Sequence, residues 1–172
     1  MNTMKPKDIT LISLFAVLTF VSSYFILPIG PVPVTTQTFF IIVTGLLLKP
    51  FSACLTQIIN IMLMCVFKSA FASPTFGFLL GFVVSATILS LLTYRKKNML
   101  LIVVATMIAS ICIYLVGIPY FVATTHGKYT FITALSVTLT PFIIGDTIKA
   151  IMAIIVAKTL RPLVKEANSK KQ

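Results

Sequence analysis

An acid and a base interrupt the last apolar stretch of the chain, within Pro141-Phe-Ile-Ile-Gly-Asp146-Thr-Ile-Lys149. Asp146 and Lys149 are three residues apart, so on a helix they lie on one face. Each such group near the centre of a spanning helix costs about 2.5–3.5 kcal/mol, so it persists where it is paired or lines a wet cavity. The pair is either an ion pair that pins two helices together or a polar recognition point for a small ligand. We favour the second interpretation, because an intramembrane ionisable residue marks a functional site by default.

The composition is that of a polytopic membrane protein. Hydrophobic residues make up 58% of the 172 residues, charged residues 10%, and the mean hydropathy is +1.07. Charged residues alone reach about 25% in soluble domains. The length fits a single domain over residues 1–172. The net charge of +11 does not indicate nucleic-acid binding, because the basic residues form short runs between apolar stretches.

The apolar stretches predict an all-α fold with six transmembrane helices, since a spanning helix needs about 20 residues. A proline-rich loop over residues 28–33 separates the first two helices. The second and third helices are short, so they end early or are completed by loop residues. The expected ranges are 9–27, 34–48, 52–67, 75–93, 99–122 and 142–160.

Lysine and arginine residues predict the orientation in the membrane. With a cytoplasmic N-terminus, eleven basic residues fall on the inner side and two, Lys68 and Lys128, on the outer side. We therefore expect a multi-pass protein of the cytoplasmic membrane with both termini in the cytoplasm. The last helix would start near Pro141, a favourable first helical position. Asp146 and Lys149 would then lie roughly 7 and 12 Å beyond its start, in the outer half of the bilayer.

Four further polar residues fall at a similar depth and are predicted to line one outward-facing cavity with Asp146. Thr36 and Gln37 open the second helix, Thr75 opens the fourth, and Tyr114 lies in the outer part of the fifth. Each also has a simpler explanation. The threonines fit helix caps, and the tyrosine fits the aromatic belt at a membrane surface.

The acidic residues do not support an enzyme. Asp8 and Glu166 are assigned to the cytoplasmic tails, which leaves Asp146 without a second carboxylate. His126, the single histidine, lies in a polar loop without a second metal ligand nearby. Zinc-protease, nucleophile-elbow and P-loop motifs are missing. We expect no catalysis, no metal and no cofactor.

The other buried polar candidates are given structural roles. Gln57 and Asn60 are expected to form hydrogen bonds between helices. Three cysteines, Cys54, Cys65 and Cys112, are expected to be small buried hydrophobic residues without a disulfide or metal role.

Two motifs together make the chain similar to a known family. One is Thr35-Thr36-Gln37-Thr38 after the proline loop, and the other is Gly145-Asp146-Thr-Ile-Lys149 after Pro141-Phe142. With residues 12–19, 44–50, 74–82 and 113–117 they resemble the BioY family of biotin transporters, the substrate-binding S components of energy-coupling-factor (ECF) transporters. The resemblance covers nearly the whole chain.

The resemblance implies six helices, cytoplasmic termini and an outward pocket for biotin. Asp146 and Lys149 match the ligand pair of the family, and the ureido ring of biotin offers N–H donors and a carbonyl acceptor to them. It also implies a transmembrane coupling subunit and two ATPase subunits as partners. In such a transporter, ATP is hydrolysed only by the ATPase subunits.

The chain departs from the family in two places. The loop between the third and fourth helices is compressed to residues 71–77 and has lost several glycines, which leaves the partner of the biotin carboxylate open; Lys68 is the nearest cation. The small-residue face of the first helix, expected to dock the coupling subunit, is reduced to Ser13, Ala16 and Val17.

Four alternatives to a biotin S component remain at this point. They are an S component for another small vitamin-like ligand, a solitary biotin facilitator, a membrane enzyme, and a structural membrane protein in which Asp146 and Lys149 form only an ion pair.

Overall fold

The computed structural model of the chain describes residues 5–27, 32, 34–96 and 98–169. The predicted all-α class is confirmed, with one small β-pair that the sequence analysis did not predict. In this pair β1 (Ile26–Leu27) runs antiparallel to β2 (Val34–Thr35). The helices are α1 (Pro6–Ser22), α2 (Gln37–Leu47), α3 (Pro50–Lys68), the 3-10 helix η1 (Ala70–Ala72), α4 (Phe76–Thr93), α5 (Met99–Thr124) and α6 (Phe131–Ser169).

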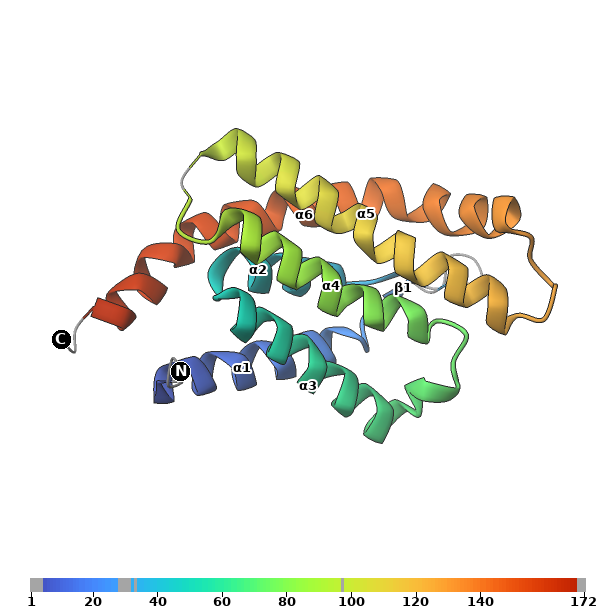
Figure 1. The fold of residues 1–172 in the computed structure, drawn as a ribbon, viewed down its shortest axis with the longest axis horizontal. Helices are drawn as coiled ribbons and strands as arrows, with labels where there is room; N and C mark the ends of the chain where they lie inside the picture. The colour runs from blue at the N-terminus through green and yellow to red at the C-terminus, as the bar shows by residue number, and fades with distance from the viewer. Residues whose placement is uncertain (1–4, 28–31, 33, 97, 170–172) are drawn as a thin grey trace.

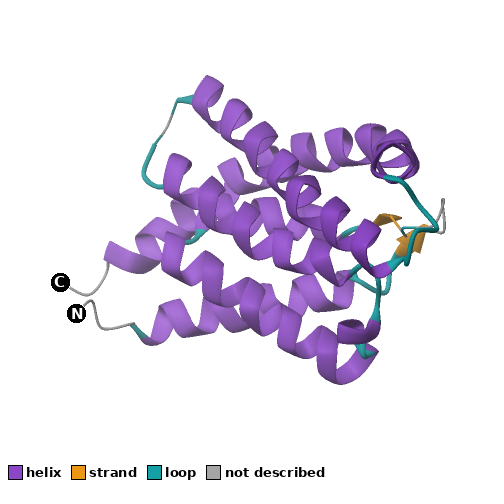
Figure 2. Ribbon diagram, turned by 45° about the vertical axis from the view of Figure 1, so that its right-hand side comes forward, coloured by secondary structure: helices purple, strands orange, loops and turns teal. Residues whose placement is uncertain are grey.

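The α-helices pack in three layers. Figure 1 shows α1 and α3 on one side, α5 and α6 on the other, and α2 and α4 between them. Helix α1 begins at the end of the bundle where α6 finishes, and the β-pair lies at the opposite end (Figure 2). Helix α2 is the centre of the core, because nine of its eleven residues are buried.

Local sequence explains where several helices begin and end. Pro50 starts α3 at the first helical position, where its missing N–H removes no hydrogen bond. Asn98 caps α5, because its side-chain oxygen accepts from the N–H groups of Leu100 and Leu101. After α4 the chain turns at Arg95, which has a φ of 64°. These boundaries match the predicted ones within two residues.

The first two helices are shorter than their predicted ranges. Helix α1 ends at Ser22 and α2 begins at Gln37, because residues 26–27 and 34–35 form the β-pair instead of helical turns. Of the two outcomes expected for the short third range, the structure shows the second: flanking residues complete α3 to 19 residues, Pro50–Lys68. Helix α2, at 11 residues, is only about 16 Å long.

The prediction that the last helix starts near Pro141 was also wrong. Helix α6 starts at Phe131 and has 39 residues, so it continues through Pro141. Asp146 therefore lies about 22 Å along the helix instead of about 7 Å. At about 58 Å, α6 is nearly twice as long as the hydrocarbon core is thick.

Three helices in the described ranges are long and apolar enough to cross a membrane: α3, α4 and α5. Helix α2 is also apolar but shorter. Many large apolar side chains on the outer helix faces are exposed, including Leu100, Leu115 and Ile132 at 67–79%. Exposed apolar surface of this extent is what a lipid-facing protein requires.

Candidate functional site

Asp146 is the centre of a polar cluster formed by three segments. Its Oδ1 accepts hydrogen bonds from Thr38 Oγ1 at 3.1 Å and from Lys149 Nζ at 2.8 Å. Its Oδ2 accepts from the hydroxyl of Tyr114 at 2.6 Å. An ionised carboxylate has about four acceptor positions. Three are used here, so one is left for a ligand donor.

Lys149 supports this carboxylate from the same helix. Its ammonium donates to Asp146 Oδ1, to the main-chain carbonyl of Thr35 at 2.7 Å and, at 3.4 Å, to Thr38 Oγ1. The Lys149 and Asp146 side chains are 15% and 11% exposed. All three ammonium donors are thus engaged. In this arrangement Lys149 orients Asp146.

A cavity of about 70 Å³ lies beside the carboxylate of Asp146. Four of the predicted site residues line it together: Gln37, Thr75, Tyr114 and Asp146. The remaining lining residues are Val32, Thr35, Thr38, Phe78, Leu79, Phe82 and Ile113. The cavity therefore combines one polar side, around Asp146, with an aromatic and aliphatic wall from α4 and α5.

Gln37 brings an unsatisfied donor to this cavity. Its side chain is 3% exposed, and its Oε1 accepts from Thr35 Oγ1 at 3.3 Å. Its Nε2 has no hydrogen-bond partner in the described part of the chain. A buried unsatisfied donor costs about 1–3 kcal/mol. A ligand acceptor placed in the cavity would remove this cost.

The apolar wall depends on the close approach of α4 and α5. The ring of Phe78 meets Tyr114 edge-to-face, with centroids 6.5 Å apart. A Cβ on Gly81 would lie 2.8 Å from the carbonyl oxygen of Ile113. Glycine at position 81 therefore allows the backbone carrying Tyr114 to approach the cavity.

Thr36 and Thr75 both occupy helix N-cap positions, as the sequence indicated, but neither side chain caps its helix. The Thr36 hydroxyl donates to Ser22 O at 2.9 Å, and Thr36 lines a groove between α1, α2 and α6 instead of the cavity. The Thr75 hydroxyl lies 2.7 Å from that of Ser73. Of the six predicted residues, Thr36 is thus the one that points away from Asp146.

Two site residues were missed by the sequence analysis. Thr38 contacts both Asp146 and Lys149, and Thr35 supplies the carbonyl that accepts from Lys149. The motif Thr35-Thr36-Gln37-Thr38 contained both, but the sequence does not show the strand-to-helix transition within it. Residues 35 and 38 face the cavity because a β-strand ends at Thr35 and a helix begins at Gln37.

Four interpretations of residues outside the cavity need correction: those of Asp8, of Lys68, of Gln57 with Asn60, and of the small-residue face of α1. Asp8 is not in a tail: it lies in the first turn of α1, 7% exposed, 2.9 Å from Lys49 Nζ. Lys68 does not line the cavity, since its ammonium donates to Ser23 O at 2.7 Å and lies 4.1 Å from the Tyr24 ring centroid. It ties the end of α3 to the end of α1.

Gln57 and Asn60 are fully buried, but they bond to each other within α3 at 3.4 Å and not between helices. On α1, Ala16 is fully buried, so only Ser13 and Val17 of the small-residue face point outward.

The cysteines and the residue types that could bind a metal do not cluster in the described part of the chain. Cys54, Cys65 and Cys112 are free and half-buried, so they are less buried than predicted. The described residues contain no group of three or more histidine, cysteine, aspartate or glutamate side chains that could hold a metal ion.

Comparison with known proteins connects this site to a family. The chain is 32% identical over 168 residues to the probable biotin transporter BioY of Pyrococcus horikoshii, covering 92% of this chain and 98% of that protein. It is 28% identical over 160 residues to the biotin transporter BioY of Thermotoga maritima, covering 87% and 93%. The fold matches the crystal structure of the S-component for biotin from an ECF-type ABC transporter, with a TM-score of 0.77, 20% identity and coverage of 93% and 95%. The sequence profile of the BioY family matches residues 1–166, so this chain belongs to the BioY family.

Proposed function

We propose that this protein binds biotin in the cavity beside Asp146 and acts as the S component of an ECF-type vitamin transporter in the cytoplasmic membrane. The observation that carries the proposal is the pairing, in one cavity, of the Asp146 carboxylate with the unsatisfied amide donor of Gln37. Membership of the BioY family and the names of the relatives support biotin as the ligand. These relatives are named as transporters, in agreement with the expectation that the chain is not an enzyme.

The ureido ring of biotin complements both groups. It offers N–H donors on two sides of a carbonyl acceptor in a flat, rigid ring, so little ordering entropy opposes binding. One N–H would occupy the free acceptor position of Asp146. The carbonyl oxygen would accept from Gln37 Nε2, which has no other partner among the described residues. Such a site rejects ligands that lack the ureido group, because its own polar atoms would stay unpaired.

Lys149 has a supporting role in this proposal. Its three donors are engaged by Thr35, Thr38 and Asp146. It neutralises the buried carboxylate and fixes its orientation, so that Asp146 presents its remaining acceptor position to the ligand. Tyr114 supports the other carboxylate oxygen in the same way.

The thiophane ring and valeryl chain of biotin would pack against Phe78, Leu79 and Phe82. The present cavity of about 70 Å³ is smaller than the 300–1,000 Å³ of typical ligand pockets. Binding therefore requires the cavity to widen. Val32 and Thr75 lie on the connecting segments at this end of the bundle, so these segments can shift without moving a helix.

The rest of the proposal concerns topology and partners. We place six crossings in the membrane from the apolar stretches. The distribution of basic residues places both termini in the cytoplasm and the cavity toward the outside. The sequence contains no P-loop motif. Uptake would therefore depend on a transmembrane coupling subunit and two ATPase subunits that hydrolyse ATP.

Equilibrium binding to the purified, detergent-solubilised chain tests the ligand. Labelled biotin should bind, desthiobiotin should compete because it keeps the ureido ring, and thiamine and riboflavin should not compete. Iminobiotin should compete poorly, because its guanidinium offers no acceptor to Gln37. Binding of thiamine or riboflavin by a folded chain that ignores biotin would contradict the proposal.

Uptake by a biotin-auxotrophic host without its own importer tests the mode of transport. An S component should give biotin uptake only when the coupling and ATPase subunits are co-expressed. Equal uptake in their absence would instead identify a solitary facilitator.

A further inference from the structure

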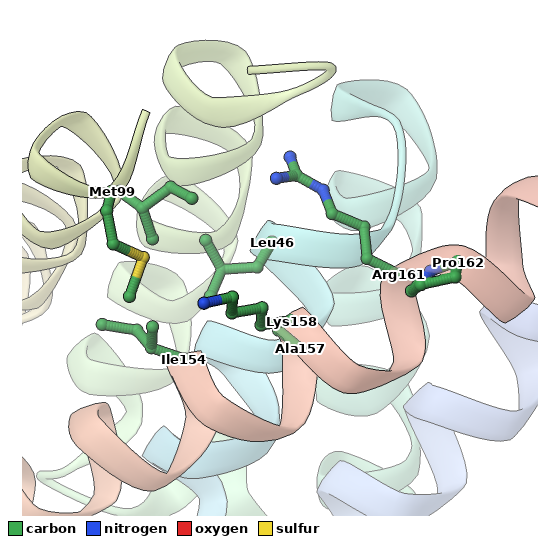
Figure 3. Close-up of a pocket in the computed structure, with 8 residues that line it drawn as sticks. Leu46, Met99, Ile154, Ala157, Lys158, Arg161 and Pro162 are labelled. Atoms are coloured by element: carbon green, nitrogen blue, oxygen red, sulfur yellow. The ribbon is translucent and has the colours of Figure 1, made fainter. Parts of the chain in front are cut away.

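A second and larger cavity lies at the other end of the bundle. It is a groove of about 390 Å³ between the end of α2, the start of α5 and the last part of α6 (Figure 3). Its lining residues are Leu46, Met99, Ile102, Ile154, Ala157, Lys158, Arg161 and Pro162. Lys158 is twelve residues beyond Asp146 on α6, so the groove lies about 18 Å along the helix from the site. It is therefore separate from the cavity beside Asp146.

The groove has apolar walls and two cations. Six of its eight lining residues are apolar, and the other two are Lys158 and Arg161. In Figure 3 the Lys158 ammonium points into the space between Met99, Leu46 and Ile154. Within the described ranges Lys158 makes no hydrogen bond or ion pair, and its side chain is exposed. The ammonium is thus available to an anionic group.

Arg161 holds the second charge in a fixed position. Its guanidinium donates to Thr93 O at 2.7 Å and to Lys96 O at 2.5 Å, beyond the carboxyl end of α4. A guanidinium has five N–H donors, so others remain for a second partner. Arg95 and Lys96, on the adjoining turn, add positive charge to this end of the protein.

We propose that this groove binds one anionic phospholipid, with an acyl chain along the apolar wall and the phosphate between Lys158 and Arg161. The charge of the groove is complementary to an anionic headgroup, and its volume lies in the range of small-molecule sites. A peptide fits less well, because its backbone N–H and C=O groups would meet few polar partners on these walls. A free anion would make no use of the apolar wall.

Native mass spectrometry of the full chain in detergent tests this proposal. The probes are palmitoyl-oleoyl phosphatidylglycerol and the phosphatidylcholine with the same chains. At about 1 kcal/mol per cation, the first phosphatidylglycerol should bind roughly 30-fold more tightly than phosphatidylcholine. Lys158→Gln should weaken phosphatidylglycerol about fivefold, and Lys158→Arg should restore it. Lys5→Gln, the same charge change at the residue before α1, should have no effect.

Two further measurements separate the parts of the proposal without relying on a variant. Dihexanoyl phosphatidylglycerol should bind more weakly than the long-chain lipid, because it fills less of the groove. Millimolar inorganic phosphate should not displace the long-chain lipid. Equal binding of the two long-chain lipids, equal effects of Lys158→Gln and Lys5→Gln, equal binding of the short-chain lipid, or displacement by phosphate would each overturn the proposal.

Discussion

Lys149 on α6 donates to the main-chain carbonyl of Thr35, 2.7 Å away, and thereby joins the helix that carries Asp146 to the β-pair before α2. The same ammonium contacts Asp146 Oδ1 at 2.8 Å. Thr35 in turn donates to the side chain of Gln37. The carboxylate and the amide proposed to recognise the ureido ring are thus held in one connected hydrogen-bond network. Networks of this kind fix the geometry of a site before the ligand arrives.

Replacing Gln37 with leucine tests the unsatisfied donor. Gln37→Leu keeps a buried side chain of similar size and removes the unpaired Nε2. Stability should change little, whereas biotin affinity should fall by about 1–3 kcal/mol, or five- to 150-fold. The measurements are equilibrium binding and the thermal midpoint in detergent.

Gln57 offers a matched control for this change. It is also fully buried with an unsatisfied Nε2, but it lies on α3 outside the cavity. Gln57→Leu should leave biotin affinity unchanged. If both leucine variants lose affinity equally, the loss reflects the fold and not a contact with the ligand.

The hydroxyl of Tyr114 should contribute to stability and to affinity. It donates to Asp146 Oδ2 at 2.6 Å, and hydrogen bonds to charged groups contribute about 1.5–3 kcal/mol. Tyr114→Phe should therefore lower the thermal midpoint and weaken biotin binding. Tyr120→Phe is the control on the same helix, because the Tyr120 ring packs on Phe76 away from Asp146. Equal midpoints for the two variants would contradict this role of Tyr114.

Gly81 should be required for the position of Tyr114. A valine there would place Cβ 2.8 Å from the backbone oxygen of Ile113, so α4 and α5 must separate. We expect Gly81→Val to lower both the thermal midpoint and biotin affinity. Gly145→Ala is the control, because the added methyl would meet Val34 at 3.9 Å, an ordinary contact. Wild-type affinity and a wild-type thermal midpoint in Gly81→Val would contradict the close packing of α4 on α5.

Much of the fold could be predicted from the sequence, because apolar runs mark most helices. The predicted starts at residues 99 and 52 lie within two residues of the observed starts of α5 and α3. The start of α6 was predicted wrongly, because proline usually begins or breaks a helix and Pro141 lies inside one. The β-pair was missed because strands of two residues leave no periodic pattern.

The candidate site could be predicted at positions where a charged or polar residue stands within an apolar stretch. Asp146 and Lys149 stand out as charges in an apolar stretch, and Gln37, Thr75 and Tyr114 follow from the depth at which they occur. The carbonyl of Thr35 could not be predicted, since every residue has one and only the fold selects it. Thr36 was assigned to the cavity because the sequence does not show which way the turn before α2 directs its side chain.

The most direct test of the central claim is biotin binding by Asp146→Asn beside the double variant Asp146→Asn/Lys149→Met. The single change leaves the Lys149 charge without its partner in a mostly buried position, which costs up to about 3–5 kcal/mol in stability. The double change removes that charge and should recover much of the thermal midpoint. If Asp146 recognises biotin, the folded double variant still fails to bind. Recovery of both the midpoint and wild-type affinity would show that the two residues form only an ion pair and would contradict the proposed site.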